Sequence, residues 1–283
     1  MRSVALYLAL LFVLASPLSF ANPLDHTCGT ETIYGISFKY CVNHVDRQQT
    51  RDIVYFFHGL QGNAESWFTH PEAAVVANYW SKHNYEPTII SVSLGGAWLL
   101  VNNDRFPLLP FFKNQMMPFL EQKIGGLQDG RRLLIGASMG GFNATQASLR
   151  LPGDFQKVAL LCPAITTIGP YASPNEIAAY IKRTGANPLL VRLMVGITKN
   201  IFEDEEDWEK HNPLKLLSRY PAPLKKPAFF VSVGTKDDYG FQEGSEAFAK
   251  EALANSFETQ WIPVAGGHCN FDVIATADFI MED

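Results

Sequence analysis

Residues 131–141 read RRLLIGASMGG. The run of Leu133, Leu134 and Ile135 is typical of a strand that is buried on both faces. A short turn with glycines on both sides of Ser138 follows, and residues 140–151 then show a helical pattern. Between a strand and a helix, the pattern G-x-S-x-G holds its serine on a sharp turn above the sheet edge. This stretch therefore predicts an α/β fold and a candidate nucleophile, Ser138.

The same alternation of short apolar runs and helical stretches continues on both sides of this motif. Alternating strands and helices predict a mostly parallel, doubly wound sheet, and a turn at Gly35 predicts an antiparallel hairpin over residues 29–40. After this hairpin, the expected strands are residues 52–57, 87–92, 132–135, 157–161, 228–233 and 259–264. The expected helices are residues 64–83, 111–124, 140–151 and 241–255.

About 65 residues separate the sixth and seventh expected strands, far more than a usual connection. They contain an apolar helical run at residues 188–201 and an acidic run at residues 203–207. One interpretation is a helical insertion, or lid, over residues 165–220 at the carboxyl edge of the sheet. The other is a plain two-helix crossover with a solvated acidic turn.

The first 21 residues have the pattern of a secretory signal peptide. Arg2 precedes an apolar run at residues 4–15, and small residues stand at Ser19 and Ala21 before a candidate cleavage site. The run is shorter than the ~20 residues that span a bilayer, so we expect no stable membrane span. The sequence thus predicts a secreted or periplasmic protein whose folded domain covers residues 22–283.

Composition narrows the class of protein further. The chain has 283 residues, of which 47% are hydrophobic and 18% charged, so it can bury a substantial core. Its net charge is −5, and lysines and arginines cluster only in pairs. A nucleic-acid partner requires a basic face, so this class is not expected. The sequence leaves the oligomeric state open.

The chain contains four cysteines, Cys28, Cys41, Cys162 and Cys269. Secretion permits disulfides, and four cysteines allow three pairings. Cys28 and Cys41 flank the expected hairpin and form the favoured pair, whereas Cys162 and Cys269 could be bridged or free. A metal site is the weaker alternative, because neither a CxxC nor an HxxxH spacing occurs.

A serine hydroxyl needs a base to act as a nucleophile. In this type of sheet the acid and the base follow the serine in the chain, on loops after late strands. His268 follows the last expected strand and is preceded by Gly266 and Gly267, which makes it the candidate base. Asp237 and Asp238 follow the preceding strand; Asp237 is the favoured acid, and Asp238 would be solvated or cap the next helix.

Backbone amides could hold an oxyanion beside Ser138. The amide of Met139 lies at a helix N-terminus, where it is free to meet an anion. The second donor is expected in the glycine-rich turn HGLQG at residues 58–62. Leu60 is favoured there, with Gln61 as the near alternative, and the His58 side chain is expected to brace the turn.

Four motifs together resemble the α/β-hydrolase superfamily. They are HGLQG at residues 58–62, GASMGG at residues 136–141, GTKDD at residues 234–238 and GGH at residues 266–268. Over residues 50–271 the chain looks most similar to the esterase D and S-formylglutathione hydrolase-like serine esterases, a branch that includes secreted feruloyl esterases and mycolyltransferase-type proteins. This resemblance implies an α/β-hydrolase fold, to which the long connection adds the expected helical insertion between the sixth and seventh strands. It also implies the triad Ser138, Asp237 and His268, with Leu60 and Met139 as oxyanion donors.

The expected function is the hydrolysis of carboxylic esters, with a small-molecule or lipid-like ester as the binding partner and no cofactor. An acyltransferase, a lipase or a peptidase could use the same three residues. A catalytically inactive binding protein on the same fold is the alternative of a different class.

Overall fold

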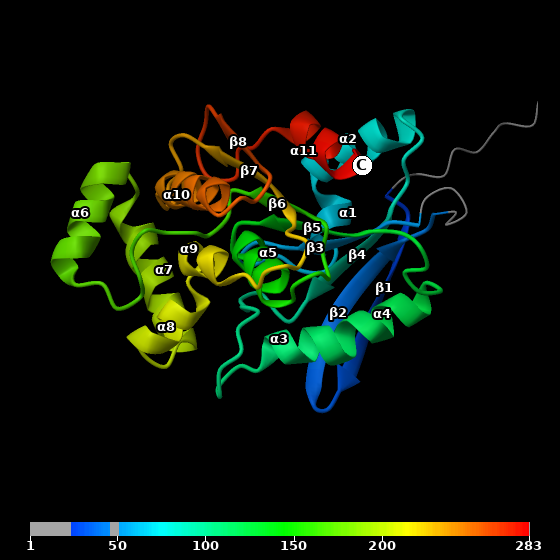
Figure 1. The fold of residues 1–283 in the computed structure, drawn as a ribbon, viewed down its shortest axis with the longest axis horizontal. Helices are drawn as coiled ribbons and strands as arrows, with labels where there is room; N and C mark the ends of the chain where they lie inside the picture. The colour runs from blue at the N-terminus through cyan, green and yellow to red at the C-terminus, as the bar shows by residue number, and fades with distance from the viewer. Residues whose placement is uncertain (1–23, 46–50, 283) are drawn as a thin grey trace, which may run out of the picture.

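The computed structural model describes residues 24–45 and 51–282, so the expected signal peptide lies outside the described residues. Within them, eight strands form a single sheet (Figure 1). The strands are β1 (His26–Ile33), β2 (Ile36–Asn43), β3 (Ile53–Phe57), β4 (Thr88–Ser93), β5 (Arg132–Ala137), β6 (Lys157–Leu161), β7 (Ala228–Gly234) and β8 (Thr259–Val264).

The strand order is β1-β2-β4-β3-β5-β6-β7-β8. The pairs β1–β2 and β2–β4 are antiparallel, and the other five pairs are parallel. Strands β3, β4 and β7 are buried at every position, which explains their continuous apolar sequences. The predicted mostly parallel sheet with an antiparallel edge hairpin is therefore confirmed, and Cys28 and Cys41 are bonded across that hairpin.

Helices cover both faces of the sheet. Apolar residues of α1, α2 and α11 pack on one face, and those of α3, α4, α5 and α10 pack on the other. None of the helices in the described ranges is long and apolar enough to cross a bilayer. The helices on the faces are α1 (Ser66–Thr69), α2 (Pro71–Lys82), α3 (Leu108–Phe111), η1 (Phe112–Met116), α4 (Met117–Lys123), α5 (Met139–Arg150), α10 (Phe241–Ala254) and α11 (Val273–Met281).

Because of proline residues, two of the observed helices differ from those expected from the sequence. The helix expected over residues 64–83 is divided into α1 and α2, because His70 precedes Pro71 and takes an extended conformation with ψ 132°. The helix expected over residues 111–124 begins three residues earlier and contains the π-helical turn η1. Pro118 follows that turn and has no N–H to donate to the carbonyl four residues before it, which accounts for the wider turn.

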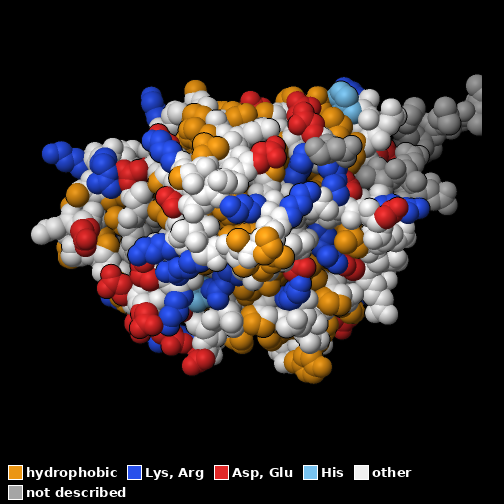
Figure 2. All heavy atoms as spheres, in the orientation of Figure 1, with side chains coloured by type: hydrophobic (Ala, Val, Ile, Leu, Met, Phe, Trp, Pro, Cys, Tyr) orange, Lys and Arg blue, Asp and Glu red, His pale blue; other side chains and the backbone are white. Residues whose placement is uncertain are grey.

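The segment between β6 and β7 forms a helical insertion, which confirms that part of the expected fold. Its helices α6 and α7 lie beyond the edge of the sheet in Figure 1, where they share a small apolar cluster around Tyr180 and Val191. The acidic run over residues 203–206 is exposed and forms the red patch over α8 in Figure 2. The insertion consists of α6 (Pro174–Thr184), α7 (Pro188–Ile201), α8 (Glu205–His211), α9 (Pro213–Leu216) and η2 (Leu217–Arg219).

Candidate active site

Ser138 occupies the turn between β5 and α5. Its backbone has φ 53° and ψ −115°, a conformation that non-glycine residues rarely adopt, and its N–H donates to the carbonyl of Leu161 at 2.9 Å. Glycine is required on both sides of Ser138, because backbone atoms of neighbouring segments lie too close for a side chain. A Cβ at Gly136 would collide with the carbonyl of Gly140, and a Cβ at Gly140 would collide with the carbonyl of Phe57. The turn therefore holds the serine side chain in a fixed position above the sheet edge.

The imidazole of His268 lies beside this hydroxyl. Ser138 Oγ is 3.0 Å from His268 Nε2, although 130 positions separate the two residues. The histidine is carried by the loop after β8, which passes close to the end of β7: a Cβ at Gly234 would collide with the carbonyl of Gly267. The glycines of this loop thus allow the close approach of two chain segments.

Asp237 holds the other side of the imidazole. Its Oδ2 is 2.7 Å from His268 Nδ1, and its Oδ1 accepts hydrogen bonds from the N–H groups of Tyr239 at 2.8 Å and Phe241 at 3.4 Å. Asp237 is only 1% exposed, whereas Asp238 is exposed. With Nδ1 donating to Asp237, Nε2 is left to accept the serine proton.

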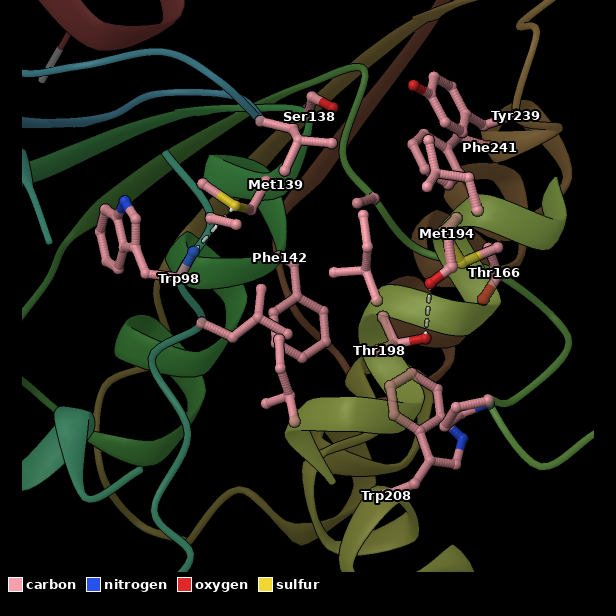
Figure 3. A pocket seen from close by; sticks show the side chains of 18 of the residues that line it. Trp98, Ser138, Met139, Phe142, Thr166, Met194, Thr198, Trp208, Tyr239 and Phe241 are labelled. Carbon is pink, nitrogen blue, oxygen red and sulfur yellow. Dashed lines mark hydrogen bonds between the residues drawn. The ribbon is translucent and has the colours of Figure 1, made fainter. Parts of the chain in front are cut away.

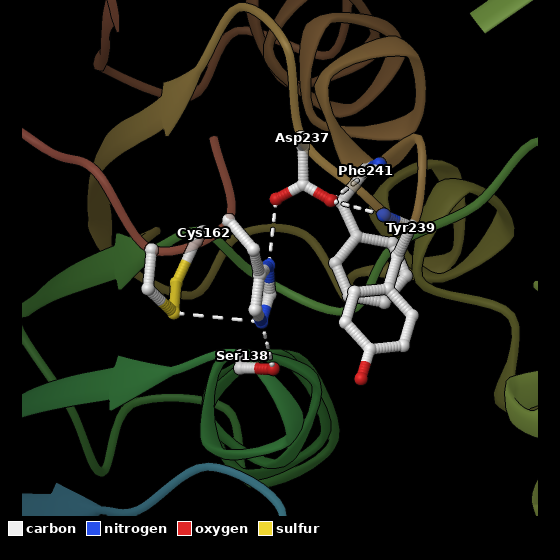
Figure 4. The surroundings of a disulfide bond; sticks show 7 residues. Ser138, Cys162, Asp237, Tyr239 and Phe241 are labelled. Atoms are coloured by element: carbon white, nitrogen blue, oxygen red, sulfur yellow. Dashed lines mark hydrogen bonds and ion pairs between the residues drawn. A yellow bond between two sulfur atoms is a disulfide. The ribbon is translucent and has the colours of Figure 1, made fainter. Parts of the chain in front are cut away.

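Two further features surround the imidazole: a pair of aromatic rings, which the sequence did not predict, and a disulfide, which the sequence left open. The rings of Tyr239 and Phe241 contact His268 edge-on, with centroid distances of 4.7 and 5.6 Å. A disulfide between Cys162 and Cys269 joins the end of β6 to the histidine loop, with Cys269 Sγ 3.6 Å from His268 Nε2 (Figure 4). The sequence left Cys162 and Cys269 bridged or free, and the structure shows that they are bridged.

The candidate oxyanion donors lie beside Ser138. Met139 is the first residue of α5, where an N–H has no acceptor within its own helix. In the turn after β3, the N–H of Gln61 donates to the carbonyl of Gly96 at 2.7 Å and is therefore engaged. This leaves Leu60 as the better candidate, and both Leu60 and Met139 line the cavity that opens at Ser138.

His58 is buried inside that same turn. Its Nδ1 lies 2.7 Å from the carbonyl of Gly59, and its Nε2 accepts a hydrogen bond from Trp98 Nε1 at 3.1 Å. Burial lowers the pKa of His58 below its usual value, so the ring is neutral and joins the turn to the neighbouring loop. These contacts agree with the expected role of the His58 side chain, which is to brace the turn at residues 58–62.

An apolar cavity extends from Ser138 under α7 (Figure 3). It encloses about 790 Å³, counting the space at its open mouth, and its walls come from α5, α7 and the loops at the sheet edge. Trp208 of α8 stands at the end opposite Ser138. The insertion therefore supplies part of the wall of the candidate active site.

Cysteines near histidines could suggest a metal site. Cys162, His268 and Cys269 are close together, and so are His26, Cys28 and Cys41. All four sulfurs are in disulfides, and metal binding by cysteine requires the free thiolate. In this state, histidine is the only metal ligand left in each group.

Solved structures of several esterases share this fold. A ferulic acid esterase matches with a TM-score of 0.65 and 16% identity, covering 91% of this chain and 96% of that one. Brefeldin A esterase, a bacterial homologue of human hormone sensitive lipase, matches with a TM-score of 0.61 and 19% identity over 97% and 75% of the chains. A thermostable esterase from Pseudomonas putida gives a TM-score of 0.60 and 18% identity over 86% and 74%. At these identities the likeness establishes the α/β-hydrolase fold alone.

No curated protein matches the sequence. The family model described as "Putative esterase" matches residues 33–272, which is most of the chain and includes Ser138, Asp237 and His268. The esterase resemblance predicted from four short motifs is thus confirmed at the level of the family, and the chain belongs to this esterase family of the α/β-hydrolase fold.

Proposed function

We propose that this protein is a serine hydrolase that cleaves carboxylic esters through an acyl-enzyme on Ser138. The observation that carries the proposal is the unbroken hydrogen-bonded chain from Ser138 Oγ through the His268 imidazole to the buried Asp237 carboxylate. Family membership supports the class of substrate, since the matched model is that of an esterase.

Each group has a defined role in the reaction. His268 Nε2 takes the proton of Ser138 as Oγ attacks the ester carbonyl, and Asp237 stabilises the imidazolium that forms. The amides of Leu60 and Met139 hold the negatively charged oxygen of the tetrahedral intermediate. His268 then protonates the leaving alcohol, and a water molecule activated by the same imidazole cleaves the acyl-enzyme.

The decisive experiment combines labelling and turnover. Wild-type protein should react with a fluorophosphonate probe at Ser138, as identified by mass spectrometry, and should hydrolyse p-nitrophenyl acetate. Ser138→Ala should lose both properties, whereas Ser148→Ala, a change of another buried serine of α5, should keep both. Labelling at a different residue, or full activity of Ser138→Ala, would reject the proposal.

We also propose that the mature protein is secreted or periplasmic, with cleavage of the signal peptide near Ala21. The two disulfides support this location, because such bonds persist mainly in oxidising compartments. The test is N-terminal sequencing of the protein after expression of the whole gene in a bacterial host. A mature start near Asn22 in the periplasm or the medium is expected, and an intact Met1 in the cytoplasm would contradict it.

A further inference from the structure

The cavity beside Ser138 has the shape and chemistry of a binding site for one part of the ester. Among the described residues that form its wall, none is charged. The wall includes the aromatic rings of Trp98, Phe142 and Trp208 and aliphatic side chains from α7 (Figure 3). An apolar group gains free energy by leaving water for such a site, whereas a charged group loses its hydration.

The two threonine hydroxyls in the wall already donate to backbone carbonyls. Thr198 Oγ1 donates to the carbonyl of Met194 at 2.9 Å, and Thr166 Oγ1 donates to the carbonyl of Ile168 at 2.7 Å. The Nε1 edge of Trp208 lies against Gly169 and points away from the cavity (Figure 3). A hydroxylated aromatic acid would give up the hydration of its phenol in this mostly apolar cavity, a cost that an aliphatic chain does not have.

The position of the cavity relative to the triad identifies which half of the ester it holds. Leu60 and Met139, whose amides would hold the carbonyl oxygen, line the cavity together with Ser138. His268 must reach the leaving oxygen, yet it is not among the described residues that form the wall. Tyr239 and Phe241, which contact His268, line the cavity near its mouth. The placement of Leu60 and Met139 therefore favours the acyl side of the scissile bond.

Helix α7 sets the length of the cavity. Leu193, Ile197 and Ile201 follow each other at intervals of four residues and line the cavity; Leu193 is also exposed to solvent, whereas Ile197 and Ile201 are half-buried. The helix rises 1.5 Å per residue, so this inner face is roughly 12 Å long. Phe142 and Trp208 lie along the part of the cavity that is remote from Ser138 (Figure 3).

From these observations we infer that the preferred substrate carries an unbranched aliphatic acyl chain of medium length, close to octanoyl, bound between α5 and α7. The inference rests on the proposed esterase function and adds the acyl specificity. Ile197 and Ile201 act as specificity-determining residues, because both line the cavity from α7 and Ile201 precedes Phe202, whose ring contacts Trp208 at the far end.

The test measures kcat/KM for p-nitrophenyl acetate, butyrate, octanoate, palmitate and ferulate. Each methylene that the cavity covers should raise kcat/KM about fourfold. Octanoate should be the best substrate, palmitate should be poorer because its chain is longer than the cavity, and ferulate should be poorer than octanoate.

Substitutions in α7 test whether the cavity causes the preference for a given acyl-chain length. Ile197→Trp should lower the ratio of octanoate to acetate activity at least about tenfold by filling part of the cavity. Asn200→Trp introduces the same bulky side chain at an exposed position of α7 that does not line the cavity, and it should leave the ratio unchanged. Ile201→Ala should move the optimum to longer chains.

The outcomes separate the two proposals. Acetate hydrolysis with Ser138 labelling, but with activity that is flat or falls with chain length, would overturn the acyl inference alone. A preference for ferulate, or an equal loss on octanoate and acetate in Ile197→Trp, would also overturn it. Failure to hydrolyse any ester, with no labelling of Ser138, would overturn the proposed function and the inference together.

Discussion

Two adjacent aspartates follow β7, but only one of them faces the imidazole. Asp237 binds His268 and accepts two backbone N–H groups, whereas the exposed Asp238 contributes its backbone carbonyl to a hydrogen bond with Asn187 N at 2.8 Å. Asp237→Asn should lower kcat on the order of 10³–10⁴-fold, because an amide no longer fixes the imidazole tautomer. Steady-state kinetics on p-nitrophenyl butyrate measures this loss.

The matched control is Asp238→Asn, which leaves that backbone contact in place. It should keep kcat near the wild-type value. A large loss in Asp238→Asn together with a small loss in Asp237→Asn would show that the triad acid has been assigned to the wrong residue. Circular dichroism of both variants establishes that they are folded.

Two buried histidines make the stability depend on pH. Burial lowers the pKa of His58 and of His211, whereas in the unfolded chain both groups titrate near pH 6.5. Below about pH 6.5 the unfolded state therefore binds more protons than the folded state, and the free energy of unfolding decreases. Urea denaturation at pH 7.5 and pH 5.5 should show this decrease.

Substitution of either histidine should reduce that difference. His58→Gln and His211→Gln each remove one group whose pKa changes on folding, while His83→Gln, at an exposed position, should keep the full pH dependence. Equal pH dependence in all three variants would show that these groups do not carry the effect.

Local patterns made some residues of the site predictable, and long-range packing determined the others. Ser138 stands in a short motif whose strand, turn and helix are all encoded within about a dozen residues. The choice of Asp237 over Asp238 depends on the direction of one turn, which the amides of Tyr239 and Phe241 fix. The contact between His58 and Trp98 joins residues 40 positions apart and has no local sequence signature.

At the scale of elements, the Cys162–Cys269 disulfide ties the histidine loop to the end of β6. The bond closes a loop of 107 positions, and by the chain-entropy model such a loop contributes about 4–5 kcal/mol to stability. Cys162→Ser/Cys269→Ser should therefore lower both the denaturation midpoint and kcat, since it also releases the loop that positions His268. Urea denaturation and kinetics on the same ester measure the two effects.

The hairpin disulfide provides the control for this experiment. Cys28–Cys41 closes a loop of only 13 positions, between two strands that lie at the far edge of the sheet from β7 and β8. Cys28→Ser/Cys41→Ser should lower stability but leave kcat unchanged. An equal loss of kcat in both double variants would mean that the bond next to His268 has no special role in positioning it.

The order of elements along the chain was readable from sequence, but their exact bounds and partners were not. Strands appeared as apolar runs because both faces of the sheet are covered, and the order Ser138, Asp237, His268 then placed the loops. The pairing of Cys162 with Cys269 requires β6 and the loop after β8 to meet at one edge. Whether β6 and this loop lie together depends on the order of the strands in the sheet. That order cannot be read from the pattern of apolar residues in the sequence.

At the scale of the whole molecule, the chain combines a large continuous core with a weakly attached pair of helices. The sheet packs between two extensive apolar clusters, whereas α6 and α7 bury Tyr180, Ala186 and Val191 in a small cluster of their own. Polar contacts then connect this pair to the loop and helix after Asp237. These are Tyr180 Oη to the carbonyl of Tyr239 at 3.0 Å, Asn187 N to the carbonyl of Asp238 at 2.8 Å, and Arg183 Nε to Glu243 Oε2 at 2.5 Å.

This division predicts unequal protection of backbone amides from hydrogen exchange. Segments with few buried apolar contacts open locally at a lower free energy than the global unfolding transition. Amides of α6 and α7 should therefore exchange faster than those of β3, β5 and α5 in the native protein, as measured by mass spectrometry. Arg183→Gln should speed exchange in α6 and α7 further while leaving the sheet unchanged, because the ion pair with Glu243 lies outside the main core. If α6 and α7 proved as well protected as β5, the insertion would be part of the cooperative core, and the cavity beneath α7 would be rigid.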